Sequence, residues 1–251
     1  MASTSLIPFL ENPVDASGVE NESKEEATSG VRAIYGADAV VELSGSYAWK
    51  RFHSAKSFKR ELEVLRRIPE NELTLRLLEE LAQTLTLVFP RLKDDLMRAL
   101  ISDREIPLRL CCDGLVAAVR FCHRLGLVHR DVKPENVLLD ELLRPVLCDF
   151  ARSVFVTEPQ SAAFEGTRYY AAPEALRGVC WLSNDVWALG LTLFCVVERA
   201  LPFDQDDGYN EEEGLRFESS AWRAQYQQQL RRAIEGMVRP DYTQRVCLDR
   251  V

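Results

Sequence analysis

The sequence predicts an α+β fold in which a small, strand-rich N-terminal lobe precedes a larger, mainly helical lobe. From Val31 to Phe52, β-branched and aromatic residues alternate with small ones around Gly36 and the turn residues 44–46, which indicates two or three short strands. From 57 to 68, apolar residues recur at steps of three and four, which predicts an amphipathic helix that Pro69 closes. Beyond Pro90 the apolar spacing is mainly helical.

Further elements follow from the same periodicities. Residues 85–89 have strand character and stop at Pro90. Two apolar faces at helical spacing predict two later helices, one ending before Gly126 and one before Gly236. The first face consists of Leu115, Ala118, Val119 and Cys122, and the second of Trp222, Tyr226, Leu230 and Ile234.

The composition is that of a globular protein without a basic surface. The chain has 251 residues, 47% of them hydrophobic, and 39 acidic against 31 basic residues give a net charge of −8. No dense Lys/Arg block interrupts this balance, so neither nucleic acid nor an anionic membrane is expected as the main partner. Nothing in the sequence indicates an oligomeric state.

The cysteines and the N-terminus suggest a reducing compartment. The seven cysteines form no C-x-x-C pair, which argues against a zinc site and a disulfide framework. The N-terminus has no basic segment followed by a long apolar run, and the longest apolar stretch, 186–197, is too short to span a bilayer. A cytosolic or nuclear protein is therefore expected.

Two regions of different composition divide the chain. Residues 1–29 are rich in Ser, Glu, Asn and Thr, and we expect a disordered leader. Residues 30–251 form the expected domain, with a first lobe at about 30–89, a connection at 90–93 and a second lobe at 94–251.

Three short motifs carry the chemistry. Residues 129–136 read His-Arg-Asp-Val-Lys-Pro-Glu-Asn, residues 149–151 read Asp-Phe-Ala, and residues 172–174 read Ala-Pro-Glu. Each could occur by chance. In this order, from about Gly36 to Arg245, they resemble the eukaryotic-type protein kinase family, of the serine/threonine kind. The resemblance implies a two-lobed fold and transfer of the γ-phosphoryl group of ATP to protein hydroxyls, with Mg²⁺.

The resemblance also assigns roles to the catalytic residues. Asp131 would accept the proton of the substrate hydroxyl and orient it, and Lys133 would reach the γ-phosphate. Asn136 and Asp149 offer the hard oxygen ligands that Mg²⁺ prefers. Thr167 would form hydrogen bonds near Asp131 and Lys133.

An ion pair is expected upstream of these motifs. Lys50 resembles the lysine that anchors ATP in this family, and Glu61 on the following helix stands where its partner would be. Glu63 is the rival. We prefer Glu61 because Leu65, four residues later on the same helix face, then falls where the family packs a core residue.

The nucleotide pocket is implied by the segment 87–96, which resembles the family's hinge between lobes. Adenine would be held by backbone groups of Pro90 and Leu92, with Phe89 at the back of the pocket. Asp95 would lie near the ribose. Ala48 and Leu138 would sandwich the ring.

The glycine-rich phosphate loop departs from the family pattern. With Val41 at its end, the three glycine positions hold Ile34, Gly36 and Ala39, so only the middle glycine is present. Because glycine lets backbone N–H groups approach phosphate, we expect weaker ATP binding. The short span to Lys50 also implies a clipped hairpin.

Ala151 replaces the glycine of the metal-binding triplet. If position 151 needs a positive φ, the alanine costs on the order of 1 kcal/mol.

The activation segment has no obvious phosphorylation site at the usual place. In the family, Arg130 awaits a phosphate on this segment, but Ala163 occupies the position four before Thr167. Thr157 and Ser161 are the other candidates. We therefore expect activity without phosphorylation of the segment, with Glu158 or Glu165 partly satisfying Arg130.

The remaining large-lobe residues have structural roles in the family. Asp185 would support the backbone of the catalytic loop, and Glu174 would pair with Arg245. The chain ends six residues after Arg245, so the last helix of the family's large lobe is expected to be missing.

Substrate preference and activity leave alternatives open. Glu135 and the acidic residues between 204 and 213 could attract arginines beside the target hydroxyl, although a solvated acidic loop would look the same. A catalytically inactive pseudokinase that binds nucleotide or acts as a scaffold is the alternative function. A third possible function is that of a helical interaction domain in which the His-Arg-Asp sequence occurs by chance.

Overall fold

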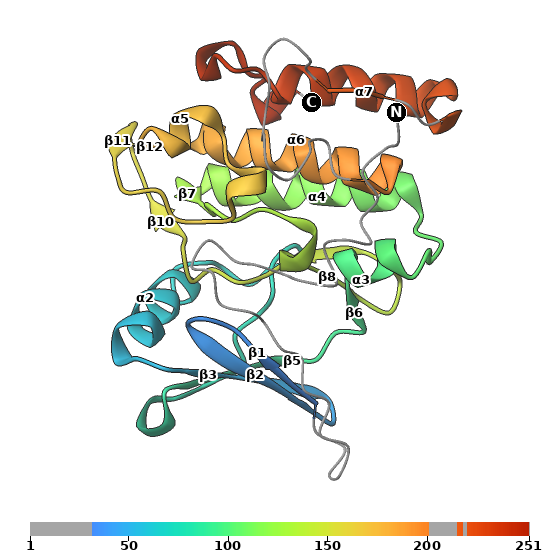
Figure 1. The fold of residues 1–251 in the computed structure, drawn as a ribbon. Coiled ribbons are helices and arrows are strands. Elements are labelled where there is room, and N and C mark those ends of the chain that lie inside the picture. Colours follow the sequence, from blue (N-terminus) through green and yellow to red (C-terminus); the bar gives the residue numbers. More distant parts are fainter. Residues whose placement is uncertain (1–31, 201–214, 218–219, 251) are drawn as a thin grey trace.

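The N-terminal part of the computed structural model is a five-stranded antiparallel sheet with one helix (Figure 1). The structure describes residues 32–200, 215–217 and 220–250, so the predicted leader and the acidic residues 204–213 lie outside the described residues. The strand order is β1-β2-β3-β5-β4. The elements of this lobe are β1 (Arg32–Tyr35), β2 (Ala39–Ser44), β3 (Tyr47–Phe52), α2 (Ala55–Leu65), β4 (Glu79–Leu81) and β5 (Thr86–Pro90).

Of the two or three short strands predicted between Val31 and Phe52, the structure has three, β1, β2 and β3. A two-residue turn at 45–46 joins β2 to β3 and pairs Ser44 with Tyr47, so the clipped hairpin is present as expected. Strand β5 begins at Thr86, one residue later than the predicted strand, because Leu85 has a φ of 51° and leaves the extended conformation.

Helix α2 begins earlier and ends earlier than the sequence suggests. The Ser54 hydroxyl accepts a hydrogen bond from the Ser57 N–H and caps the helix, so it starts at Ala55. The helix ends at Leu65, and residues 66–68 form a turn. Pro69 favours this end because its ring disfavours the helical conformation of the residue before it. Its buried face includes Phe58, whose ring meets Phe52 of β3 edge to face at 5.8 Å between centroids.

The C-terminal part is dominated by helices α4, α6 and α7, which Figure 1 shows stacked above the sheet with α6 in the middle. Small strands lie beside these helices and between them and the N-terminal sheet. The helices are α3 (Leu96–Ile101), α4 (Leu108–Arg124), α5 (Pro173–Leu176), α6 (Leu182–Glu198) and α7 (Gln225–Met237). The strands are β6 (Asp94–Asp95), β7 (Leu127–Val128), β8 (Val137–Leu139), β9 (Pro145–Leu147), β10 (Val154–Phe155), β11 (Gln160–Ser161) and β12 (Val179–Cys180).

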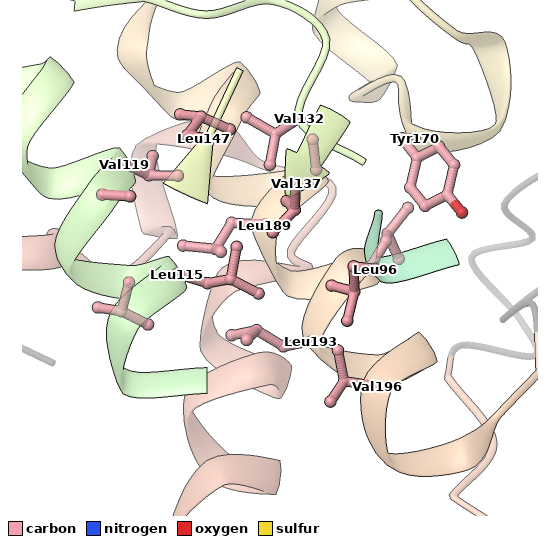
Figure 2. Packing of buried hydrophobic residues seen from close by; sticks show 14 of the residues in the cluster. Leu96, Leu115, Val119, Val132, Val137, Leu147, Tyr170, Leu189, Leu193 and Val196 are labelled. Carbon is pink, nitrogen blue, oxygen red and sulfur yellow. The ribbon is translucent and has the colours of Figure 1, made fainter. Parts of the chain in front are cut away.

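The core of the C-terminal part forms around α6. Residues 183–197 of this helix are all buried. Figure 2 shows Leu115 and Val119 of α4 pointing toward Leu189 and Leu193 of α6. The predicted face of α4 is confirmed, since all four of its residues are fully buried. Because α6 is packed on every side, it gives a rigid base to the loop that follows β7.

The last predicted helix differs from the structure at both ends. Trp222 lies in a separate 3₁₀ turn, and α7 begins only at Gln225. The helix also continues through Gly236 to Met237 instead of stopping before it. The reason is packing, because a Cβ atom at Gly236 would lie 2.6 Å from the side chain of Val246. The glycine thus permits close approach and does not end the helix.

Three general findings complete the fold. None of the described helices is long and apolar enough to cross a membrane. All seven cysteines are free, and six are buried. The described residues contain no group of three or more His, Cys, Asp or Glu side chains placed to hold a metal ion.

Candidate active site

Lys50 forms two short ion pairs where the sheet, α2 and the segment after β9 meet. Its Nζ atom lies 2.6 Å from Glu61 Oε2 and 2.7 Å from Asp149 Oδ1. Glu61 is 1% exposed, whereas Glu63 faces solvent. The predicted choice of Glu61 is confirmed, and Leu65 packs in the core as expected.

The charges of this triad follow from its burial and mutual contacts. Burial disfavours a charged lysine, but the negative charges of Asp149 and Glu61 outweigh it and raise the pKa of Lys50. Burial likewise opposes the charge on Asp149, yet the charge and hydrogen bond of Lys50 hold the pKa of Asp149 well below its usual range. Burial raises the pKa of Glu61 to about 7 against the opposing effect of Lys50. A charged lysine and an ionised Asp149 therefore face each other at neutral pH.

The catalytic-loop residues predicted from the motif form one hydrogen-bond network. Thr167 donates from its backbone N–H and its hydroxyl to Asp131 Oδ1, at 2.9 and 2.8 Å. Lys133 Nζ donates to the Thr167 hydroxyl at 2.7 Å. Asn136 Nδ2 donates to the Asp131 carbonyl and to Asp131 Oδ2, at 2.8 and 3.1 Å. The structure thus brings Asp131, Lys133, Asn136 and Thr167 together.

A buried carboxylate holds the loop that carries Asp131. Asp185 in α6 accepts hydrogen bonds from the backbone N–H groups of His129 and Arg130, at 2.7 and 2.8 Å. Arg130 has a φ of 71°, a left-handed conformation that is unfavourable for a non-glycine residue. The two hydrogen bonds that Asp185 accepts hold this conformation in place, which confirms the predicted supporting role.

Gly166 lets the activation segment approach the same loop. Its φ is 134°, and a Cβ atom there would lie 2.4 Å from the Arg130 carbonyl oxygen. Only glycine fits this approach. The following residue, Thr167, is thereby placed against Asp131.

The two residues expected to bind metal lie on neighbouring backbone segments. The Asn136 carbonyl accepts a hydrogen bond from the N–H of Cys148, the residue before Asp149. Because the Asn136 Nδ2 atom is occupied by Asp131, its amide oxygen is the atom left for a cation. An amide oxygen and an ionised carboxylate fit the hard ligands of a magnesium site.

The residues expected around adenine come from two pairs of strands, β3 with β5 and β6 with β8. Ala48 in β3 pairs with Phe89 in β5, and Phe89 is 5% exposed. Leu138 lies in β8, where it pairs with Asp95 of β6. Among the residues that the structure describes, none accepts a hydrogen bond from the Leu92 N–H, and this group is free to bind a ligand.

Asp95 and Pro90 have local structural roles as well. The Asp95 side chain accepts a hydrogen bond from the Arg98 N–H at 2.8 Å and caps α3. Pro90 ends β5 and pairs with Tyr47 across the sheet. The predicted contacts of these two residues with a nucleotide stay predictions.

The reduced glycine loop is a tight hairpin between β1 and β2. Ile34 pairs with Val41, and Val41 in turn pairs with Lys50. The Gly36 N–H donates to the Ala39 carbonyl at 2.9 Å. The N–H that we expected to approach a phosphate is therefore occupied in this turn, which strengthens the expectation of a loose phosphate grip.

The strain considered for Ala151 is not found. The positive φ in the triplet is at Asp149, with a value of 63°, and Ala151 has no positive φ. Alanine fits its position, so the condition for a cost of about 1 kcal/mol is not met.

We expect Ala151→Gly to leave phosphoryl transfer within about twofold of wild type, because no backbone strain is relieved. Steady-state kinetics at saturating ATP would check this. A fall of tenfold or more would show that the Ala151 methyl group has a role that the local geometry does not reveal.

Two further expectations about charges can be compared with the structure. Arg245 and Glu174 form a buried two-pronged ion pair, as expected. Arg130 Nη1 lies 3.6 Å from Glu165 Oε2, which selects Glu165 over the exposed Glu158 as its acidic neighbour. Arg130 Nη2 also donates to the Ala163 carbonyl at 2.6 Å.

Sequence reasoning missed two arginines close to these groups. Arg152 Nε lies 3.9 Å from Asp131 Oδ2, and its Nη2 atom lies 4.0 Å from Asp38 in the β1–β2 turn. Arg60 in α2 contacts Glu165. No sequence signal identified Arg60 because its partner lies more than a hundred residues away, whereas Arg152 directly follows the Asp-Phe-Ala triplet and could have been considered.

Comparison with known proteins agrees with this geometry. The family model described as the protein kinase domain matches residues 41–251. The chain belongs to the protein kinase family. Because the match begins at Val41, the departures at Ile34 and Ala39 in this kinase domain lie outside the matched residues.

Curated relatives of this kinase domain match over shorter stretches. It is 34% identical to the probable serine/threonine-protein kinase KCC4 of Saccharomyces cerevisiae, over 46% of this chain and 12% of that protein. It is 40% identical to the serine/threonine-protein kinase GIN4 of the same yeast, over 38% of this chain and 8% of that protein. It is 38% identical to the MAP kinase kinase skh1/pek1 of Schizosaccharomyces pombe, over 39% of this chain and 28% of that protein. The matches thus span a small part of each relative.

Proposed function

We propose that this kinase domain transfers the γ-phosphoryl group of ATP to serine and threonine hydroxyls of proteins. One observation carries the proposal. Lys50 bridges Glu61 and Asp149 in the same structure in which Asp131 is held by Thr167 and Asn136. A group that anchors phosphates and a carboxylate that orients a hydroxyl are the two components that phosphoryl transfer requires.

The residues have distinct tasks in this reaction. Asp131 accepts the proton of the acceptor hydroxyl as its oxygen attacks the γ-phosphorus, and the bond from that phosphorus to the bridging oxygen of ADP breaks. The positive charge of Lys133 stabilises the negative charge that spreads over the transferring group. Lys133 is well suited because its neighbours, with Asp131 foremost, raise its pKa despite its burial. Lys50 anchors the phosphates of the nucleotide.

Asn136 and Asp149 would hold Mg²⁺, which would neutralise phosphate charge when bound. The donor set fits, because Asp149 is ionised and the amide oxygen of Asn136 accepts no hydrogen bond from the described residues. The protein's own contribution is to keep both groups in place by the Asn136–Asp131 and Asp149–Lys50 contacts.

A cluster of carboxylates supports a preference for arginine beside the acceptor. Burial, and then the charges of Asp94 and Glu135, raise the pKa of Asp95 to about 7. The Oε2 atom of Glu135 is buried and has no hydrogen-bond partner among the described residues. A guanidinium group would supply the missing donor and offset the repulsion. We therefore propose protein substrates with basic flanks.

Kinetics on matched peptides test the proposal. Each peptide carries one Ser, Thr or Tyr acceptor and arginine, alanine or glutamate flanks, and mass spectrometry locates the phosphate. We expect phosphoserine and phosphothreonine, no phosphotyrosine, and kcat/KM at least about tenfold higher with arginine flanks. Phosphotyrosine would contradict the serine/threonine assignment, and a preference for glutamate flanks would contradict the basic-substrate proposal. Nucleotide binding without labelling of any acceptor would favour the pseudokinase alternative.

Glu135→Gln should remove most of the arginine advantage while the rate on alanine-flanked peptides changes less than about twofold, because only the charge facing the flank is lost. Glu141→Gln is the matched control, since Glu141 is exposed. An arginine preference that survives Glu135→Gln unchanged would assign it to another part of the chain.

A further inference from the structure

One carboxylate in the activation segment contacts two other parts of the molecule. Glu165 lies two residues before Thr167. Its Oε2 atom is 2.5 Å from Arg60 Nη2 and 3.6 Å from Arg130 Nη1. Arg60 belongs to α2, the helix that carries Glu61, and Arg130 directly precedes Asp131. Glu165 therefore connects the activation segment to both the N-terminal lobe and the catalytic loop.

Arginines predominate around this carboxylate. The Arg130 side chain is only 10% exposed, and a shielded guanidinium needs a negative partner to be stable. Burial opposes the charge on Glu165, but the close contact with Arg60 and the charges of Arg130 and Arg152 keep the pKa of Glu165 below its usual value. Glu165 is therefore a permanent negative charge at this point under physiological conditions.

Backbone contacts fix the same stretch of chain. Strand β11 pairs with β12, so Gln160 lies opposite Cys180 and Ser161 opposite Val179. The Ala162 N–H donates to the Gly178 carbonyl at 3.0 Å, and Arg130 holds the Ala163 carbonyl. Arg60 of α2 also donates to the Arg152 carbonyl at 3.3 Å, so the helix contacts the start of the segment as well as Glu165. Residues 160–165 are thus held without a phosphoryl group.

We propose that Glu165 is a positioning residue that holds α2 and the activation segment against the catalytic loop, so that this kinase domain needs no phosphoryl group on the segment. Glu165 acts through Arg60 and Arg130, and through Gly166 it places Thr167 on Asp131. The kinetic consequence rests on the proposed function, whereas the structural consequence does not.

A double-mutant cycle tests whether Glu165 acts through Arg60. The protein is treated with phosphatase, and wild type is compared with Glu165→Gln, Arg60→Gln and the double variant. We expect each single variant to lower kcat about tenfold, with the KM for ATP changed less than about threefold because the Lys50–Glu61 pair stays. The double variant should lose no more than the worse single variant, because the two residues share one interaction.

Two exposed neighbours provide matched controls. Glu158 lies in the activation segment and Lys59 precedes Arg60 in α2, and both face solvent. Glu158→Gln and Lys59→Gln should stay within about twofold of wild type, as is usual for exposed side chains. Losses that multiply in the double variant, or controls that fall as far as Glu165→Gln, would contradict the proposal.

Hydrogen exchange gives a second measurement that does not depend on activity. Glu165→Gln should speed exchange of the amide hydrogens of Ala162 and Thr167 at least about tenfold while the melting temperature stays within a few degrees. Unchanged exchange would overturn the proposal. If wild type transfers no phosphate at all, the proposed function fails, and this measurement still decides the role of Glu165.

The need for phosphorylation is tested directly on the wild type. Phosphatase-treated protein should keep at least about half of its activity, because the negative charge at Arg130 is part of the chain. A loss of tenfold or more on treatment, recovered by phosphorylation at Thr157 or Ser161, would overturn the proposal.

Discussion

Replacing Arg245 with methionine should lower the free energy of unfolding by about 3–5 kcal/mol, because it leaves a buried carboxylate without its counter-ion. Arg245 Nη2 donates to Glu174 Oε2 at 2.8 Å, and Nη1 contacts the other carboxylate oxygen at 2.5 Å. Glu174 is 3% exposed. Arg245 also lies over the Trp187 ring in α6 and donates to the Ser183 carbonyl, so one side chain joins α5, α6 and the end of the described chain.

Denaturant unfolding followed by circular dichroism measures this change. Arg232→Met is the control, because Arg232 is an exposed arginine of α7 and its loss should change stability by less than about 0.5 kcal/mol. Adding Glu174→Gln to Arg245→Met should recover part of the loss, since the uncompensated charge is then gone. A loss below about 1 kcal/mol in Arg245→Met, or no recovery in the double variant, would show that the pair does not stabilise the fold as we describe.

Asp131→Asn should lower kcat by about 10²–10⁴-fold, the usual range for removing a general base. The asparagine oxygen can still accept the two hydrogen bonds from Thr167, and Asn136 Nδ2 can still donate to the backbone carbonyl of residue 131. The proton acceptor is lost, together with the bond from Asn136 Nδ2 to Oδ2. The KM for ATP should change less than about threefold, because Lys50 forms its ion pairs with Glu61 and Asp149 and not with this carboxylate.

Steady-state kinetics and a thermal melt of the same samples separate chemistry from folding. Glu141→Gln is again the control because Glu141 is exposed. A variant that melts like wild type and retains more than a tenth of its kcat would show that Asp131 is not the proton acceptor.

Sequence reasoning predicted those parts of the site that lie in short contiguous motifs. Asp131, Lys133 and Asn136 are close in sequence, so their local arrangement follows from the chain itself. The choice of Glu61 over Glu63 also followed from local geometry, since a helix places only one of the two on the buried face.

Contacts set by tertiary packing were harder to predict. The partner of Glu165 is Arg60, and nothing local distinguishes Arg60 from Lys59 or Lys56 on the same helix. Gly236 was interpreted as a helix end because glycine often has that role, yet the close approach of Val246 decides its position. The occupied N–H of Gly36 likewise depends on a hairpin register that spacing alone did not give.

Single-turnover transfer from labelled ATP is the most direct test of the central claim, that Lys50, Asp149, Asn136 and Asp131 form one working site. Wild-type protein in excess over ATP is mixed with a serine peptide with arginine flanks, while nucleotide binding is followed by calorimetry in parallel. We predict that ATP binds in the presence of Mg²⁺ and that label appears on the serine. Tight binding of ATP with no label on the peptide would contradict the claim.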